Sequence, residues 1–197
     1  MLAIQGDYAS HAAALEEVGA EPVLVRKPDQ LAGLEGLIIP GGESTTFLKF
    51  LERDGFLESL RAFVAATPTF GTCAGCILLA AKVLHPPQDS LGVLDATVER
   101  NAYGRQIDSS IREGKFVSNL NHHLKGQAAS DAPLEMVFIR APKIVHVGDG
   151  VEVLATEGSD PVAVRQGRTM AVTFHPELSD DTRVHQAFLY LIANGKL

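Results

Sequence analysis

The sequence predicts an α/β fold in three layers, with a mostly parallel central sheet flanked by helices and a small antiparallel extension. Two patterns predict this class. In the first half of the 197 residues, short β-branched runs alternate with helical stretches, as in parallel sheets covered by helices on both faces. In the second half, strand-like runs follow one another with turns between them. Because no internal repeat or low-complexity linker interrupts the chain, we expect a single domain over residues 1–197.

The first half is expected to alternate strands and helices. Gly19 is a natural stop for the first helix, and Ser44 and Thr45 can cap the second. The third helix carries apolar residues at helical spacing on one face. The expected strands are Leu2–Gln5, Glu21–Arg26, Gly36–Pro40 and Thr69–Thr72. The expected helices are Asp7–Val18, Thr46–Arg53, Phe56–Ala66 and Ala74–Val83.

The second half follows the break at Pro86-Pro87 and is expected to consist mainly of strands, several of which form an antiparallel extension or a small second sheet. The polar stretch Glu113–Pro133 is expected to be a loop with one short strand, and Asp180–Asn194 a closing helix. The expected strands are Val93–Glu99, Phe116–Asn119, Met136–Arg140, Val151–Thr156, Pro161–Arg165 and Thr169–Phe174.

Composition argues against several classes of function. Hydrophobic residues make up 46% and charged residues 21%, which is ordinary for a soluble globular protein. A formal net charge of -7 without a basic run argues against nucleic acid or an anionic membrane surface as the main partner. No apolar stretch approaches the ~20 residues of a membrane span, and the N-terminal residues lack a signal-peptide pattern. Because two cysteines three positions apart do not form a secreted disulfide framework, we expect a cytoplasmic protein.

Gly71-Thr72-Cys73-Ala74-Gly75 is the most informative segment and lies between an expected strand and an expected helix. The G-x-C-x-G pattern is the thiol version of the G-x-S-x-G nucleophile elbow. The positive end of the following helix favours the reactive thiolate, and the turn directs backbone N–H groups towards an oxyanion. Cys73 is therefore the candidate nucleophile. The alternative is a buried cysteine that only packs between sheet and helix.

Cys76 forms a C-x-x-C pattern with Cys73, which raises a thioredoxin-like redox interpretation. The aromatic residue and the proline usual around such a site are missing here. We expect Cys76 to occupy an apolar position in the first helical turn, beside Ile77 and Leu78.

A thiol nucleophile needs a base, and the base needs a group that orients it. His175 follows an expected strand directly, and the ends of parallel strands are where open α/β sheets place their sites. Pro176 stiffens the backbone, and Glu177 can turn back to the imidazole. The remaining histidines are interpreted as residues without a catalytic role; His11 and His185, for example, lie on expected helices. No spacing typical of metal ligands is present, so no metal or cofactor is expected.

Pro40-Gly41-Gly42-Glu43 joins an expected strand to a helix. The simplest interpretation is a tight, capped turn. A phosphate cradle is a second, although the Gly-Lys-Ser/Thr of Walker loops is missing. An oxyanion hole built from glycine N–H groups is a third.

Five pieces of sequence together resemble the class I, or triad, glutamine amidotransferases. Two of them, R-N-A-Y-G-R-Q and F-I-R-A-P, resemble in particular the glutaminase subunit of pyridoxal 5′-phosphate synthase. The pieces run in order from residue 40 to residue 177: P-G-G-E-S-T-T, F-G-T-C-A-G, E-R-N-A-Y-G-R-Q, F-I-R-A-P and F-H-P-E.

This resemblance implies a Cys73, His175 and Glu177 triad that hydrolyses L-glutamine through a γ-glutamyl thioester. It implies an oxyanion hole at Gly42 and Ala74. The implied glutamine-binding residues are Gly41, Gly42, Glu43, Arg100, Ile139 and Arg140. An arginine suits a substrate carboxylate because it can pair with it through two hydrogen bonds. Without the resemblance, Arg100 and Arg140 would be interpreted as ordinary surface ion pairs.

The resemblance also implies a partner, a (β/α)8-barrel synthase subunit that receives the ammonia, and no pyridoxal phosphate bound to this chain. The alternatives are a glutaminase that serves another synthase, such as imidazole glycerol phosphate synthase, a thiol redox protein or a binding module. The sequence departs from the family at Cys76, where relatives usually carry an aliphatic residue, so that a side disulfide is conceivable. It also departs in the long polar stretch Asn119–Pro133.

Overall fold

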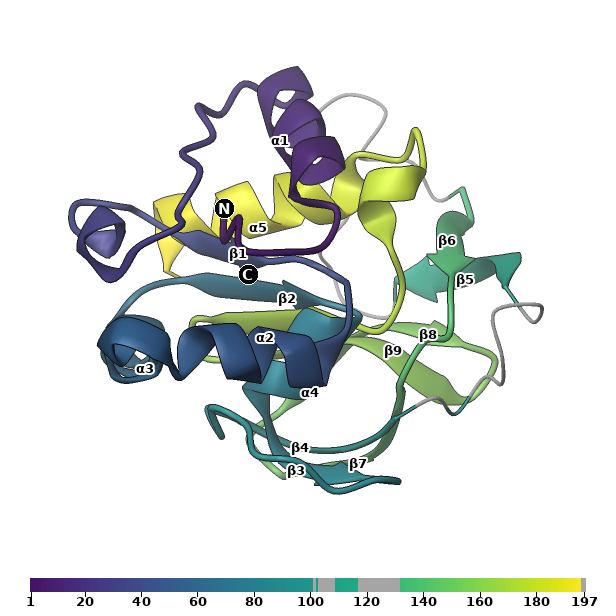
Figure 1. Ribbon diagram of the computed structural model, residues 1–197. Coiled ribbons are helices and arrows are strands. Elements are labelled where there is room, and N and C mark those ends of the chain that lie inside the picture. The colour runs from purple at the N-terminus through teal and green to yellow at the C-terminus, as the bar shows by residue number, and fades with distance from the viewer. Residues whose placement is uncertain (101, 103–108, 117–131, 196–197) are drawn as a thin grey trace.

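A computed structural model describes residues 1–100, 102, 109–116 and 132–195, and it has the predicted α/β fold (Figure 1). Its larger sheet is parallel at the core and antiparallel from β10 outward. In spatial order its described strands are β1 (Leu37–Ile39), β2 (Thr69–Thr72), β10 (Thr169–Val172), β9 (Asp160–Gln166), β8 (Glu152–Glu157), β5 (Ser110–Phe116) and β6 (Leu134–Phe138).

The N-terminal residues continue the parallel order beyond β1, but with less regular structure than predicted. The expected strands Leu2–Gln5 and Glu21–Arg26 are reduced to one parallel bridge between Leu2 and Val25. The Leu2 N–H donates to the Ile38 carbonyl at 2.9 Å, so the segment lies against β1.

Helices cover both faces of the large sheet (Figure 1). On one face lie α1 (Tyr8–Glu17) and α5 (Arg183–Asn194); on the other lie α2 (Ser44–Leu51), α3 (Phe56–Ala66) and α4 (Ala74–Leu79). Short 3₁₀ turns are η1 (Pro28–Leu31), η2 (Arg53–Gly55) and η6 (Pro176–Leu178). No helix in the described part of the chain is long and apolar enough to cross a lipid bilayer.

Alternation along the strands divides the core in two. Leu37 and Ile39 belong to the cluster packed with α2, α3 and α4, whereas Ile38 belongs to the cluster packed with α5. In β10, Ala171 joins the first cluster and Met170 the second. Successive strand residues point to opposite faces, so a sheet covered on both sides needs nearly continuous apolar strands.

A second, smaller sheet is formed by β3 (Ala80–Leu84), β4 (Leu94–Glu99) and β7 (Lys143–Val147). The predicted helix Ala74–Val83 is therefore wrong beyond Leu79, because the chain becomes extended at Ala80 and pairs with Leu94. The expected strand around Val93–Glu99 is confirmed as β4, which β7 joins in antiparallel fashion.

The largest errors of prediction lie around the polar middle of the chain. The expected loop is wrong from Glu113 to Lys115, because these residues belong to β5, which ends at Phe116, the first residue of the expected strand. Strand β7 was not expected. The rest of the expected strand Phe116–Asn119 and most of the expected loop lie outside the described residues. Ile139 and Arg140 follow β6 instead of ending it, which frees both residues for the site described below.

Candidate active site

Cys73 lies in the sharp turn between β2 and α4, with the unusual dihedral angles φ 48° and ψ -101°. A Cβ on Gly75 would lie 2.1 Å from the Ile39 carbonyl oxygen, and one on Gly71 would lie 2.6 Å from the Gly75 carbonyl. Real Cβ atoms do not approach that closely, so Gly75 is needed for the elbow to pack against β1, and Gly71 for β2 to pack against α4. The predicted nucleophile elbow is present, with the thiol 6% exposed at its tip.

The strand that leads to His175 lies parallel to the strand that leads to Cys73. Thr72 of β2 stands beside Val172 of β10, and the Cys73 N–H donates to the Val172 carbonyl at 3.0 Å. β10 ends at Val172, two residues earlier than predicted. The chain then crosses towards β6, where the His175 N–H donates to the Val137 carbonyl at 2.8 Å.

The imidazole of His175 bridges a thiol and a carboxylate. Its Nδ1 lies 2.7 Å from Glu177 Oε1, and the Cys73 side chain lies close enough to the ring to raise its pKa. Glu177 belongs to η6, and its carboxylate is fully buried. Burial alone would lower the pKa of His175, but the hydrogen bonds and negative charges of Cys73 and Glu177 outweigh it and raise the pKa to about 10. The charged imidazole is therefore favoured at neutral pH.

The glycine loop after β1 lies against this imidazole. A Cβ on Gly41 would be 2.4 Å from His175 Cε1, so only glycine fits there. Gly42 has φ +144°, a conformation that residues with a side chain rarely adopt. The side-chain amide of Gln5 donates to the Glu43 carbonyl at 2.8 Å and fixes the loop from the N-terminal segment.

Glu43, and not Ser44 or Thr45, caps the helix that follows the glycine loop. Its carboxylate accepts from the N–H groups of Thr45 and Thr46, at 3.2 and 2.7 Å, and from both threonine hydroxyls. Desolvation would raise the pKa of Glu43, but these hydrogen bonds outweigh it and lower the pKa to about 2. Glu43 therefore remains ionised throughout the neutral range, held beside the cavity by α2.

One cavity of about 250 Å³ joins these parts. Glu43 and Arg100 stand close together in its wall, with 3.3 Å between Oε1 and Nη2. Arg100 follows β4 of the small sheet, and Arg140 follows β6 with φ 46° and an exposed side chain. The cavity is lined by Asp7, Gly41, Gly42, Glu43, Ser44, Cys73, Ile77, Arg100, Ile139, Arg140, His175 and Leu178.

Two predicted site residues do not line the cavity. Glu177 stands behind His175. Ala74 is the first residue of α4, so its N–H has no carbonyl partner within that helix and remains available next to the thiol. Of the predicted motif after Arg100, residues 101 and 103–106 lie outside the described residues.

Cys76 has the packing role expected for it. It is fully buried in the core with Ile77 and Leu78, and burial, with the charge of Cys73 as a lesser cause, raises its pKa to about 12. Both cysteines are free, so the side disulfide is not formed. Across the described residues, no group of His, Cys, Asp or Glu side chains has the arrangement of a metal site.

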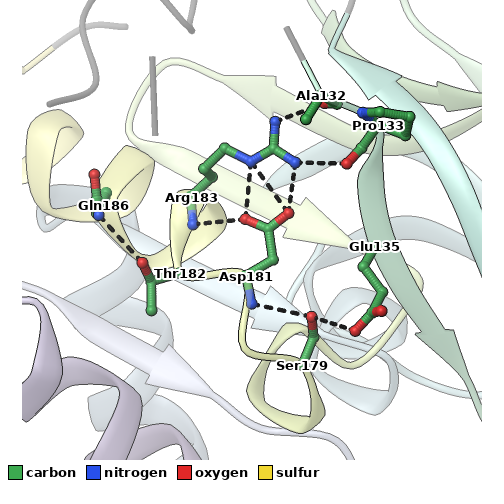
Figure 2. Close-up of polar contacts among 8 residues, drawn as sticks. All are labelled: Ala132, Pro133, Glu135, Ser179, Asp181, Thr182, Arg183 and Gln186. Carbon is green, nitrogen blue, oxygen red and sulfur yellow. Dashed lines mark hydrogen bonds and ion pairs between the residues drawn. The ribbon is translucent and has the colours of Figure 1, made fainter. Parts of the chain in front are cut away.

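The turn that carries Glu177 is held by a buried arginine (Figure 2). Arg183, 6% exposed, pairs with Asp181 through Nε and Nη2 and donates to the carbonyls of Ala132 and Pro133 at 2.9 and 2.7 Å. Ser179 extends the contact by donating to Glu135 at 2.8 Å. These bonds fasten the segment after the triad to the beginning of β6.

Sequence reasoning missed several residues near the triad. Asp7, Ile77 and Leu178 line the cavity, and no motif distinguished them, whereas Ser44, which also lines it, lies in the P-G-G-E-S-T-T piece but was expected only to cap a helix. His11 and His185 were expected to be ordinary helical histidines, yet both are fully buried behind Glu177. The signal that could have found them was their place on the apolar face of a helix: His11 is one turn from buried Leu15, and His185 lies three residues before Phe188.

Comparisons with known proteins agree with this geometry. The model of the SNO glutamine amidotransferase family matches residues 1–194. The chain is 53% identical to pyridoxal 5′-phosphate synthase subunit PdxT of Koribacter versatilis, covering 99% of this chain and 95% of that protein. It is 47% identical to the PdxT of Geobacillus kaustophilus, over 100% and 95% of the two chains. A crystal structure of a glutamine amidotransferase superposes with a TM-score of 0.85 and 44% identity, covering 98% of this chain and 97% of that one. This chain therefore belongs to the SNO glutamine amidotransferase family.

Proposed function

We propose that this protein is the glutaminase subunit of a pyridoxal 5′-phosphate synthase, hydrolysing L-glutamine and delivering ammonia to a partner synthase subunit. The observation that carries the proposal is that one cavity brings the expected groups together. Its wall contains the thiol of Cys73, the imidazole of His175 and every residue expected to contact glutamine. The PdxT proteins, which match nearly the whole chain, are named as subunits of that synthase and support the choice of pathway.

The reaction would begin with attack of the Cys73 thiolate on the side-chain amide carbon of glutamine. His175 Nδ1 is held by Glu177, which leaves Nε2 for the reacting groups. The N–H groups of Gly42 and Ala74 would stabilise the oxyanion that forms at the carbonyl oxygen. When that intermediate collapses, the C–N bond breaks and the imidazolium of His175 gives its proton to the departing ammonia. A γ-glutamyl thioester on Cys73 remains.

Hydrolysis of the thioester would reuse the same residues. Neutral His175 takes a proton from water, the resulting hydroxide attacks the thioester carbonyl, and the C–S bond breaks to give glutamate and the thiolate. Glu177 keeps the imidazole in one tautomer and stabilises its charged form in both halves of the cycle. The proton that His175 gives to ammonia is replaced by the proton that it takes from water. The catalytic cycle therefore closes without a cofactor.

The charged groups of the cavity suit the two ends of an amino acid. Glu43 supplies a permanent negative charge for the α-ammonium group, and Arg100 and Arg140 supply positive charge for the α-carboxylate. Ile139 adds apolar surface beside the aliphatic part of the substrate. In the free protein Arg100 pairs with Glu43, so glutamine would compete with that ion pair on binding.

We further propose that the partner is a (β/α)8-barrel synthase subunit in a hetero-oligomer, and that the protein acts in the cytoplasm. The partner follows from the family to which the PdxT proteins belong. Two free cysteines suit a reducing compartment, where thiols persist.

The test is glutamine hydrolysis by the purified chain, alone and with a candidate barrel subunit, together with synthesis of pyridoxal 5′-phosphate from sugar phosphates. Cys73→Ala should abolish hydrolysis, whereas Cys76→Ala should leave most of it. Ammonia incorporated into an imidazole product instead would identify a glutaminase of another synthase. Equal loss in both cysteine variants would favour redox chemistry, and no hydrolysis with any barrel subunit would favour a binding module.

A further inference from the structure

Behind the triad lies a buried group of polar side chains that the proposed reaction does not use. His11 of α1 and His185 of α5 are fully buried, with 2.9 Å between His11 Nδ1 and His185 Nε2. The other nitrogen of His11, Nε2, lies 3.1 Å from Thr72 Oγ1 and 3.2 Å from Glu177 Oε2. His11 therefore reaches both the strand that carries the nucleophile and the carboxylate that orients the base.

The second oxygen of Glu177 needs a donor. An ionised carboxylate only accepts hydrogen bonds, and His175 Nδ1 occupies Oε1 alone. Among the described residues Oε2 is buried without a well-directed hydrogen bond, and the nearest nitrogen is His11 Nε2 at 3.2 Å, which also forms a hydrogen bond with Thr72 Oγ1 and would share its proton between the two oxygens. A buried carboxylate oxygen without a donor is costly, and the missing bond leaves the carboxylate free to rotate about its last torsion.

One set of proton positions on the two rings agrees with the buried atoms that lack partners. If His11 carries its proton on Nε2, its Nδ1 accepts from His185 Nε2–H. His185 Nδ1 is then a bare lone pair, which agrees with the lack of any hydrogen-bond partner at that buried atom. Burial, followed by the charges of His185 and His175, keeps the pKa of His11 well below its usual range, so the ring is neutral.

We infer that His11 is a positioning residue of the triad: its neutral Nε2–H holds Oε2 of Glu177, so that Oε1 remains aligned with His175. This inference rests on the proposed glutaminase reaction for its kinetic consequences, but its geometry does not depend on it. The order is His185, His11, Glu177, His175, Cys73, and each neighbouring pair is in contact. Helices α1 and α5 lie on the face of the sheet opposite α4 (Figure 1). Through this series of contacts, their histidines help to position the base that serves the nucleophile.

The first test needs no variant and no activity. Nitrogen NMR of the histidine-labelled full chain distinguishes the two neutral tautomers and the charged form of each ring. We expect His11 to be neutral with its proton on Nε2 at pH 7. A proton on Nδ1, or a charged ring, would overturn the inference whatever the protein turns out to catalyse.

The second test uses two substitutions of similar size. The side-chain nitrogen of glutamine can take the place of Nε2, whereas that of asparagine takes the place of Nδ1 and falls short of Glu177. With the barrel subunit present, and with activity expressed per reactive Cys73 thiol, His11→Asn should lower kcat about tenfold to a hundredfold, the range typical of groups that orient a reacting residue. KM should remain within about twofold. His11→Gln should recover most of kcat.

The matched control is His146→Asn on β7, an exposed histidine, which should behave like the unchanged protein. Two outcomes would show that His11 only packs in the core. One is an equal kcat in both His11 variants. The other is a lower melting temperature with an unaltered kcat per reactive thiol. Lack of glutaminase activity in the unchanged protein would instead count against the proposed function, and the NMR result would still decide the inference about His11.

Discussion

Close backbone approaches determine which residues the active site can accept. Gly41 lies against the imidazole of His175, Gly75 allows the elbow of Cys73 to meet β1, and Gly71 allows β2 to meet α4. Motifs predicted the nucleophile, the base and the orienting carboxylate, because each stands at a recognisable strand end. They did not predict Asp7 or His11, whose proximity to the site results from the folding of distant segments.

Replacement of Gly41 by alanine tests the fit at the imidazole. The new Cβ would lie 2.4 Å from His175 Cε1 and would displace the ring. Displacement of about 1 Å at a catalytic group costs roughly a hundredfold in rate, so kcat should fall by about that factor while the fold persists. The rate of glutamine hydrolysis at saturating glutamine measures this fall in kcat. Gly150→Ala is the control, because its Cβ would meet only the flexible end of Gln166 at 3.3 Å. Equal activity in the two variants would contradict the geometry.

The ionisation of His175 should limit activity at high pH. Its pKa is about 10 in the folded protein, and the imidazolium is needed to protonate the departing ammonia. We expect kcat/KM to remain level above neutrality and to fall near pH 10. Steady-state hydrolysis from pH 7 to 10.5 in stable buffers measures this dependence, with far-UV circular dichroism as the control for unfolding, because the chain has no tryptophan and tyrosine ionises in this range. A fall centred near pH 7 would show that Cys73 and Glu177 do not raise the pKa of the imidazole.

Strands β1 and β2 were predicted well, whereas β5 was not. Parallel strands buried on both faces are apolar throughout, so β1 and β2 were visible in the sequence. At Ala80 the residues favour a helix, but pairing with β4 outweighs that local preference. Most residues of β5 are charged or partly exposed, and its one fully buried position is Gly114, so neither alternation nor propensity indicated a strand.

The buried arginine after the triad should stabilise the link between η6 and β6. In Arg183→Met, the Asp181 carboxylate and the carbonyls of Ala132 and Pro133 lose their donor. Breaking a buried ion pair by removing one partner costs about 3–5 kcal/mol of unfolding free energy, and the partial exposure of Asp181 places the expected loss at the lower end, about 3 kcal/mol. Equilibrium unfolding in urea measures this loss of unfolding free energy. Arg165→Met breaks the more exposed pair with Glu152 and should cost less than about 1 kcal/mol.

Over the whole molecule, buried histidines make stability depend on pH in two directions. His175 has a folded pKa of about 10, above its unfolded value, so its contribution is complete below about pH 6.5 and is lost as pH rises through 10. His185 has a folded pKa of about 4 because of burial, and the pKa of His11 is lowered in the same sense. Their contributions are complete above about pH 6.5 and diminish as pH falls towards 4.

The acid side of this dependence can be measured directly. Between pH 6.5 and 4, His185 alone should reduce the unfolding free energy by on the order of 3 kcal/mol, because the unfolded chain binds its proton first. His185→Gln keeps an N–H donor for His11 but does not titrate, so the slope of stability against pH should be shallower. His146→Gln, on the surface, should leave the slope as it is. An identical slope in all three proteins would refute the neutral, buried state of His185.

The central claim concerns the covalent intermediate on Cys73, and the most direct measurement is to trap it. A reactive glutamine analogue, 6-diazo-5-oxonorleucine, should label the assembled complex of this chain with its barrel subunit, and peptide mass mapping should place the adduct on Cys73 alone. Excess glutamine should protect against labelling, Cys73→Ala should remain unlabelled, and Cys76→Ala should label normally. An adduct on another residue, or hydrolysis of glutamine by Cys73→Ala at the rate of the unchanged protein, would contradict the account.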